Sequence, residues 1–152
     1  MRVSKSFIEK IPWMVSLLFI LLFVYAAVSK LINHHQFYND LRNSIVFGNQ
    51  VVSEIMSWGI PVLELVIALL LVIPKFNKKG LYMALILMTG FTLYIGGTLL
   101  INELGIAELP CSCGGVISHL SWQQHLLFNT FFVLLGIIAI YPLADKNKHI
   151  AS

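Results

Sequence analysis

Charged residues are scarce in this sequence. Asp, Glu, Lys and Arg make up only 11% of its 152 residues, whereas soluble domains carry about 25%. Hydrophobic residues account for 58% of the chain, and the mean hydropathy is +0.84. A soluble domain of this length could not bury so much apolar sequence, so the composition excludes that class. It indicates an integral membrane protein in which residues 1–152 form one compact domain.

Cysteine is also scarce, because the chain holds only Cys111 and Cys113, one residue apart. A disulfide between them would close almost no loop and would therefore constrain the unfolded chain little. It would also form a tight ring, and strained disulfides tend to be labile and redox-active. The spacing thus favours thiol–disulfide redox chemistry. An inert structural pair and a metal site remain as alternatives.

Four apolar runs are present, each long enough to cross a bilayer as a helix of about 20 residues. They predict an all-α integral membrane four-helix bundle whose spans cover about residues 11–31, 55–73, 81–101 and 122–141. The first run is longer than the ~7–15 residues of a usual signal-peptide core, so we interpret it as a transmembrane helix. In the third run, Gly90, Gly96 and Gly97 are small residues that would let helix backbones approach.

The longest polar segment, residues 33–53, lies between the first two runs. Phe37, Leu41 and Ile45 recur in it at helical spacing. This pattern is compatible with a short amphipathic helix on the membrane surface and equally with an ordinary loop.

Basic residues are distributed unevenly between the segments that join the apolar runs. Eight of the ten Lys and Arg residues lie in the N-terminal segment, the turn at residues 74–80 and the C-terminal tail. The positive-inside rule therefore predicts that both termini are cytoplasmic and that the cysteine loop faces the periplasm, or the exterior if there is only one membrane. We expect the membrane to be a bacterial inner membrane. Disulfides form and persist outside the cytoplasm. The basic excess is thus a topology signal, and we expect no nucleic-acid partner.

Polar side chains recur on one face of the fourth predicted helix. Trp122, His125 and Asn129 follow the spacing i, i+3 and i+7. His125 could stabilise a thiolate, relay a proton or donate a hydrogen bond to a quinone carbonyl. Alternatively, Trp122 is an interfacial aromatic and the polar residues tie helices together. With Cys111, Cys113 and His119, the loop also offers a soft-metal site for Cu(I) or Zn.

Glu64 lies near the middle of the second apolar run, where an ionisable group is costly. We therefore expect it to face the bundle interior rather than lipid. Lys30 closes the first run. Its side chain either extends to the membrane interface or meets Glu64 inside the bundle.

Taken together, these features resemble the MauE/DoxX family of redox-associated membrane proteins, and most of all its short MauE-type members. The resemblance rests on Ala-Ala-Val-Ser-Lys-Leu at residues 26–31, on Pro61-x-x-Glu64, and on Leu-Pro-Cys-Ser-Cys-Gly-Gly leading to Trp122-x-x-His125-x-x-x-Asn129. It implies a four-helix membrane bundle. MauE is associated with maturation of a disulfide-rich periplasmic dehydrogenase subunit alongside a thioredoxin-like partner, and DoxX with a quinone-linked oxidoreductase. Disulfide-generating bundles of the DsbB type are similar but have more cysteines.

Two functional hypotheses follow. In the first, the protein is a membrane thiol–disulfide oxidoreductase that exchanges electrons between a periplasmic thioredoxin-like protein and a quinone. Cys111, Cys113 and His125 would carry the chemistry, and Trp122, Asn129, Glu64 and Lys30 would contribute to the quinone site. In the second, it is a non-enzymatic membrane subunit or chaperone that docks a periplasmic partner, with a structural or metal-binding cysteine pair. In both, the helices contact the lipid bilayer.

Overall fold

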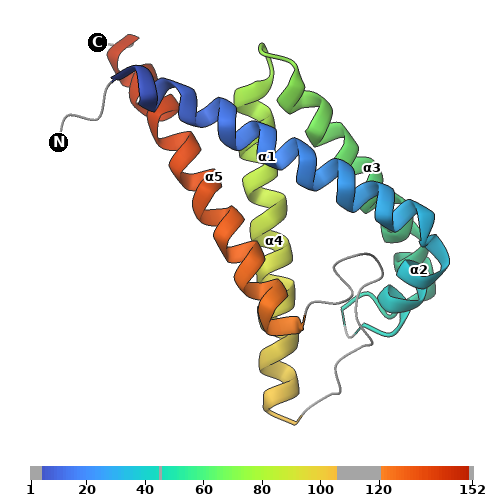
Figure 1. The fold of residues 1–152 in the computed structure, drawn as a ribbon. Coiled ribbons are helices and arrows are strands. Elements are labelled where there is room, and N and C mark those ends of the chain that lie inside the picture. Colours follow the sequence, from blue (N-terminus) through green and yellow to red (C-terminus); the bar gives the residue numbers. More distant parts are fainter. Residues whose placement is uncertain (1–4, 45, 106–120, 151–152) are drawn as a thin grey trace.

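The computed structural model describes residues 5–44, 46–105 and 121–150, with side chains described for residues 10–44, 46–105 and 121–141. Within these ranges the chain is all-helical (Figure 1). The helices are α1 (Lys5–Ile32), α2 (His34–Arg42), α3 (Gln50–Val72), α4 (Asn77–Glu103) and α5 (Trp122–Ile150).

Four of these helices are long and apolar enough to cross a membrane, with candidate spans Lys10–Ile32, Gln50–Val72, Asn77–Glu103 and Trp122–Tyr141. This confirms the predicted four-helix membrane bundle. The helices extend beyond the apolar runs, because hydropathy marks the membrane core and not the helix ends. At the start of α3, for example, the Asn49 side chain accepts hydrogen bonds from Val51 N and Val52 N at 3.0 and 3.4 Å. Such N-caps stabilise a helix start in polar sequence.

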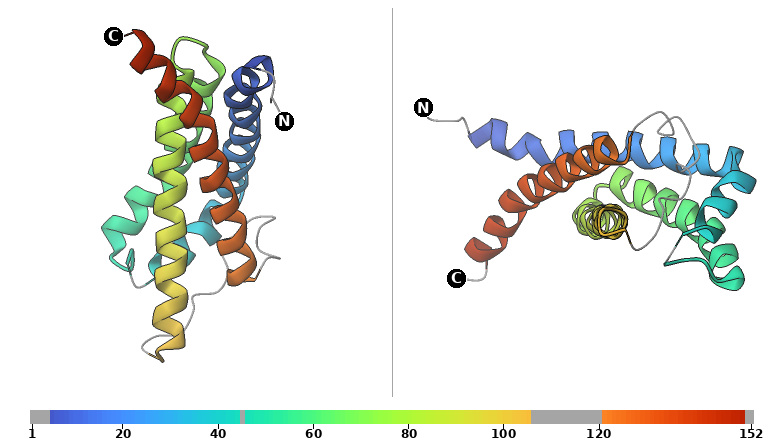
Figure 2. Two further views of the ribbon diagram at one scale, coloured as in Figure 1. Left: turned by 90° about the vertical axis from the view of Figure 1, so that its left-hand side faces the viewer. Right: turned by 90° about the horizontal axis from the view of Figure 1, so that it is seen from below.

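The four long helices form a closed ring in which α1 packs on α3 and α5, and α4 packs on the same two helices. Both termini and the α3–α4 turn lie at one end of the bundle, which we call the closed end. From there α1 and α5 diverge toward the opposite end, the open end, where α2 lies and where α4 ends and α5 begins (Figures 1 and 2).

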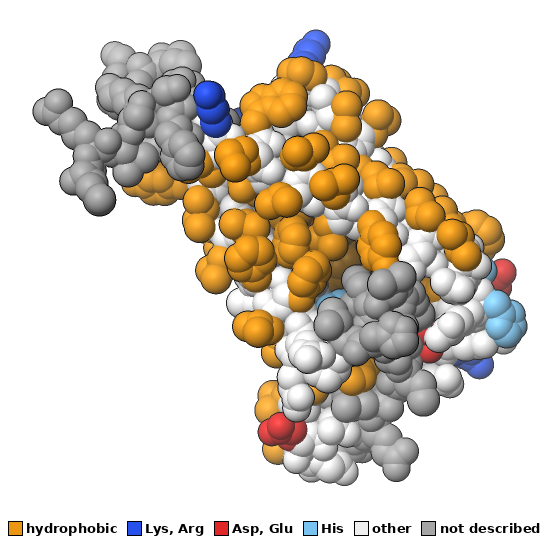
Figure 3. Space-filling model, viewed as in Figure 1, with side chains coloured by type: hydrophobic (Ala, Val, Ile, Leu, Met, Phe, Trp, Pro, Cys, Tyr) orange, Lys and Arg blue, Asp and Glu red, His pale blue; other side chains and the backbone are white. Residues whose placement is uncertain are grey.

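The apolar core is concentrated toward the closed end. Phe19 stacks on Phe23 with ring centroids 5.7 Å apart and meets Phe132 of α5 at 5.6 Å. Between lipid-exposed helices the hydrophobic effect contributes little, so van der Waals contact and interhelical hydrogen bonds hold such a core together. Its other buried members are Val15, Ile67, Ala68, Leu71, Leu81, Ala84, Met88 and Ala139. On the outside, apolar side chains cover the middle of the face in Figure 3, and charged side chains gather toward the ends.

A buried polar junction joins α1, α3 and α4 at the closed end. The Asn77 side-chain amide donates to Ser16 Oγ at 2.9 Å and to the Leu71 carbonyl at 2.8 Å. Ser16 Oγ in turn donates to the Pro12 carbonyl at 2.7 Å. The last carbonyls of a helix have no partner within it, so Asn77 satisfies one such group of α3. Beside this junction, a Cβ atom on Gly80 would lie 3.0 Å from the backbone nitrogen of Leu71.

The polar segment after α1 contains a helix, which favours the helical alternative for residues 33–53 over a loop. Ile45 lies outside the described residues, and the position of this helix on the membrane surface stays a prediction. Phe37 and Leu41 of α2 are buried, and α2 packs on α3. His34 Nε2 lies 3.1 Å from Ser57 Oγ of α3, and the His34 ring lies 4.2 Å from the Trp58 ring. Helix α2 is therefore fixed against α3 at the open end of the bundle.

The orientation of the bundle in the membrane stays a prediction. Because eight of the ten basic residues lie in segments assigned to the cytoplasm, a reporter fused after residue 77 should report the cytoplasm. The same reporter fused after residue 106 should report the periplasm. Alkaline phosphatase and green fluorescent protein fusions, which are active on opposite sides of the membrane, provide matched readouts. The inverse pattern would contradict the orientation and, with it, the oxidising location of the cysteines.

Candidate functional site

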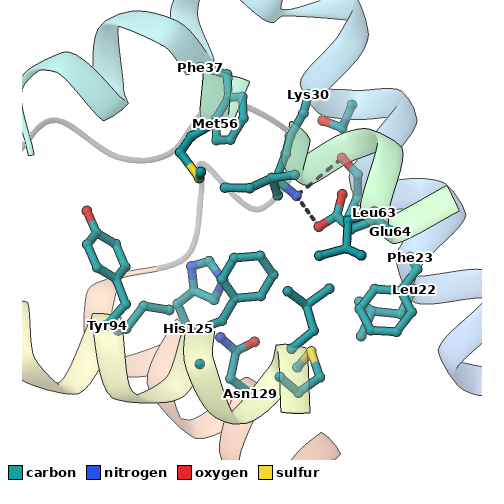
Figure 4. A pocket seen from close by; sticks show the side chains of 18 of the residues that line it. Leu22, Phe23, Lys30, Phe37, Met56, Leu63, Glu64, Tyr94, His125 and Asn129 are labelled. Atoms are coloured by element: carbon teal, nitrogen blue, oxygen red, sulfur yellow. Dashed lines mark hydrogen bonds and ion pairs between the residues drawn. The ribbon is translucent and has the colours of Figure 1, made fainter. Parts of the chain in front are cut away.

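A cavity of about 450 Å³ lies between the diverging helices, on the open-end side of the core, and the core residues Phe23 and Met88 belong to its lining (Figure 4). Helices α1, α3, α4 and α5 form its walls, and Phe37 and Leu41 of α2 contribute to its lining. Most lining residues are apolar or aromatic, and the polar side chains are few. Binding sites for small molecules have this composition and a volume of about 300–1,000 Å³.

An ion pair occupies one wall of the cavity. Lys30 Nζ of α1 lies 2.7 Å from Glu64 Oε1 of α3. Glu64 is 1% exposed and the Lys30 side chain is 17% exposed. Lys30 also donates to the Ala26 carbonyl at 3.5 Å, and its Nζ lies 5.8 Å from the ring centroids of both Phe37 and Phe91. Two aromatic faces and a carboxylate thus surround the ammonium group.

This geometry confirms the prediction that Glu64 faces the bundle interior. It also decides between the two alternatives for Lys30, whose side chain turns inward to meet Glu64 (Figure 4). The antiparallel packing of α1 on α3 brings these two residues, 34 positions apart, to the same level. The long, flexible stem of lysine spans the remaining distance.

One oxygen of the carboxylate has no partner. Glu64 Oε2 is buried, and no donor among the described residues lies within hydrogen-bonding distance of it. Buried polar atoms are nearly always hydrogen-bonded, so each exception calls for an explanation. Glu64 is one of the residues that line the cavity, so this unpartnered acceptor belongs to the wall of the candidate site.

Helix α5 supplies two polar groups to the opposite wall. His125 and the buried Asn129 both line the cavity, one turn apart (Figure 4). Trp122, predicted to share their face, is half-buried and does not belong to the described lining. The structure therefore brings His125 and Asn129 to the cavity but not Trp122, and the roles expected of all three stay predictions.

The start of α5 is held by reciprocal hydrogen bonds. Gln124 N donates to Ser121 Oγ at 3.2 Å, and Ser121 N donates to Gln124 Oε1 at 2.9 Å. This is a capping box, which satisfies two backbone donors that the helix itself cannot. It fixes the first turn of α5 and, with it, His125, whose backbone nitrogen donates to the Ser121 carbonyl at 2.9 Å. The Ser-x-x-Gln pattern is a readable sequence signal for this helix start.

Helix α4 brings Gly90 and Tyr94 to the lining, and the sequence interpretation assigned neither to a site. Gly90 was expected to permit close helix packing, but a Cβ atom there would meet nothing within 4 Å. That expectation is wrong for Gly90 and Gly97, since α4 does not approach another backbone closely at either glycine. At Gly96 the neighbouring helix is closer, because a Cβ atom there would lie 3.7 Å from Leu126 Cδ1 of α5.

Cys111, Cys113 and His119 lie outside the described residues. The described residues on either side of their segment are Gly105, which follows α4 with φ 68°, and Ser121, which caps the start of α5. Both belong to the open end of the bundle, where the cavity lies. Among the side chains that the structure describes, no group of three His, Cys, Asp or Glu could hold a metal ion. The alternative metal site at Cys111, Cys113 and His119 therefore stays a prediction.

Comparison with known proteins adds one finding. A family model described as "Methylamine utilisation protein MauE" matches residues 8–142, which is most of the chain. No curated protein and no solved structure matches. The comparison supports the MauE part of the resemblance, and the DoxX part stays a prediction. The protein is a multi-pass membrane protein, and it belongs to the MauE family, which is tied to methylamine utilisation.

Proposed function

We propose that this protein is a membrane thiol–disulfide oxidoreductase. Cys111 and Cys113 exchange with a periplasmic thioredoxin-like protein, and a quinone bound in the cavity accepts or supplies the electrons. The observation that carries the proposal is the cavity itself. It is apolar enough for a membrane-borne ring, it offers a few polar groups, and it lies toward the end of the bundle where α4 ends and α5 begins.

The chemistry balances in either direction. Oxidation of the two thiols to a disulfide releases two electrons and two protons, and reduction of a quinone to a quinol consumes the same number. Exchange with the partner conserves both, because one disulfide is broken for each one formed. His125 lines the cavity and is the group that we assign to proton delivery at a quinone oxygen. Asn129 is assigned to hydrogen bonding with the same ligand.

The cysteine exchange is tested by trapping. Thiolate attack on a disulfide passes through a mixed disulfide, and removal of the second cysteine leaves that intermediate unresolved. Cys111→Ser and Cys113→Ser, expressed separately, should therefore yield, in one variant, a higher-mass adduct on non-reducing gels after acid quenching and alkylation. Reduction should remove the adduct, and the double variant should show none.

Absence of the adduct in both single variants, together with full function of the double variant in its host, would refute the exchange. The protein would then be a membrane subunit or chaperone that docks a periplasmic partner. Metal bound by the wild type and lost in the double variant would instead support the site at Cys111, Cys113 and His119. The quinone step is measured separately. When ubiquinone-1 is mixed with the reduced wild-type protein in nanodiscs, the absorbance of ubiquinone-1 should decrease.

A further inference from the structure

We propose that the cavity is a quinol-selective site open to the bilayer, in which Glu64 Oε2 accepts a hydrogen bond from a hydroxyl group of the reduced ligand. The inference rests on the proposed function only in taking a quinone–quinol couple as the ligand. Beyond the proposed function, the inference specifies which redox form binds more tightly, which atom discriminates between the forms, and where the ligand enters.

The discriminating atom is an acceptor without a donor. Glu64 Oε1 is paired with Lys30 at 2.7 Å, whereas Oε2 has no partner among the described residues. An ionised carboxylate can only accept hydrogen bonds. A buried acceptor without a partner costs about 1–3 kcal/mol. A ligand that brings a donor to Oε2 removes this cost, and a ligand without one leaves it in place.

The two redox forms of a quinone differ in this property. A quinol hydroxyl donates a hydrogen bond and also accepts one, whereas a quinone carbonyl only accepts. On the opposite wall, the Asn129 amide and the His125 ring are both able to donate a hydrogen bond to an oxygen of either form. The Lys30 ammonium also carries more hydrogen-bond donors than its one short contact uses. Only the quinol therefore satisfies both kinds of group in the cavity.

The lining also shows where a ligand can enter. Leu63 of α3 and Ile86 of α4 line the cavity and are 38% and 71% exposed. Gly90, one turn after Ile86, is exposed as well and has open space at its Cβ position. These residues lie near the middle of their membrane-spanning helices. An opening at that level faces acyl chains, so the ligand enters from the bilayer and not from water.

The first test blocks the cavity without touching the ion pair. Gly90→Leu places a side chain in the open lining, and Gly59→Leu makes the same change at an exposed position of α3 that also has nothing within 4 Å. Both are built on the Cys111→Ser/Cys113→Ser background, so that no electron transfer consumes the probe. Ubiquinone-1 and its reduced form are titrated under nitrogen into protein in nanodiscs, and binding is measured by calorimetry.

We expect the unblocked protein to bind the reduced probe at least about tenfold more tightly than the oxidised probe, since one hydrogen bond to a charged group separates the two forms. Gly90→Leu should weaken binding of both forms at least about tenfold, because it fills part of the cavity. Gly59→Leu should leave both affinities within about twofold, because surface changes away from the site have small effects.

The second test removes the carboxylate that contains the discriminating atom, and with it the ion pair to Lys30. Glu64→Gln replaces the acceptor by a carboxamide that can also donate, so the preference for the reduced probe should disappear or reverse. Glu54→Gln, at an exposed position of the same helix, is the matched control and should keep the preference. If Glu64→Gln fails to fold, Gly90→Leu still tests the site, since it leaves the ion pair intact.

Equal affinity for the two forms, no binding of either form, or unchanged binding in Gly90→Leu would each overturn the inference. None of these outcomes affects the mixed-disulfide trap, which reports on the cysteines alone. Conversely, selective quinol binding together with no trapped adduct and a fully functional double variant would uphold the site and refute the exchange with a partner. Equal affinity for the two forms would overturn the inference alone, whereas no binding of either form would also remove the quinone from the proposed function.

Discussion

Replacing Lys30 with methionine is expected to lower the free energy of unfolding by about 3–5 kcal/mol, the cost of leaving one member of a buried ion pair without its partner. Glu64 is 1% exposed and has one oxygen that already lacks a donor. Without Lys30, neither oxygen would have a partner among the described residues. This is the largest single-residue effect that we expect from the cavity wall. Reversible unfolding in mixed micelles of SDS and a mild detergent measures it.

The double variant Lys30→Met/Glu64→Met separates the cost of an orphaned charge from the net value of the pair. Replacing a whole buried pair by apolar residues is often nearly neutral, so the double variant should regain most of the lost stability. Lys75→Met, at an exposed lysine in the α3–α4 turn, is the control and should stay within about 0.5 kcal/mol of wild type. A Lys30→Met protein as stable as wild type would contradict the burial of the pair.

Replacing Gly80 with leucine is expected to lower the free energy of unfolding by about 3 kcal/mol, the upper part of the usual range for an overpacked core. A Cβ atom at this position would lie 3.0 Å from the Leu71 backbone nitrogen and 3.0 Å from Leu71 Cδ2. A backbone atom of a packed helix cannot move aside, so α3 and α4 would have to separate at Gly80. The nearby hydrogen bonds of Asn77 would be strained by the same displacement.

Gly97→Leu provides the matched comparison, because it makes the same change in the same helix where a Cβ meets nothing within 4 Å. That variant should be neutral or slightly more stable, since leucine favours helix over glycine by somewhat less than about 1 kcal/mol. Unfolding in the same mixed micelles measures both. Equal stability of Gly80→Leu and Gly97→Leu would contradict the close approach of the two helices at Gly80.

The four spans could be predicted because bilayer thickness sets a length that apolar runs must match. The inward position of Glu64 could be predicted for a similar reason, since a carboxylate in lipid is costly. The identity of its partner could not be predicted, because it depends on how α1 and α3 align over 34 positions of sequence. The periodicity of α2 indicated a helix but carried too few apolar positions to exclude a loop.

The cavity could not be predicted from the sequence. A cavity is space that side chains leave empty, and here it results from the divergence of helices rather than from any motif. Gly90 illustrates the difficulty, because a glycine in a membrane helix usually indicates close packing, and in this protein it borders open space. His125 and Asn129 were predictable from their spacing, whereas Tyr94, within an apolar run, gave no comparable signal.

The separation of the core from the cavity has a consequence for local stability. Helices open in cooperative units, and regions with few packed side chains open at the lowest free-energy cost. Phe19, Leu71, Leu81 and Ala139 are fully or almost fully buried in the closed half, which also holds the Asn77 junction. The half that contains the cavity lacks an equivalent packed interior, so its amide hydrogens should exchange through smaller, more frequent openings. Ligand entry can then proceed by partial separation of the helices while the closed half keeps the molecule folded.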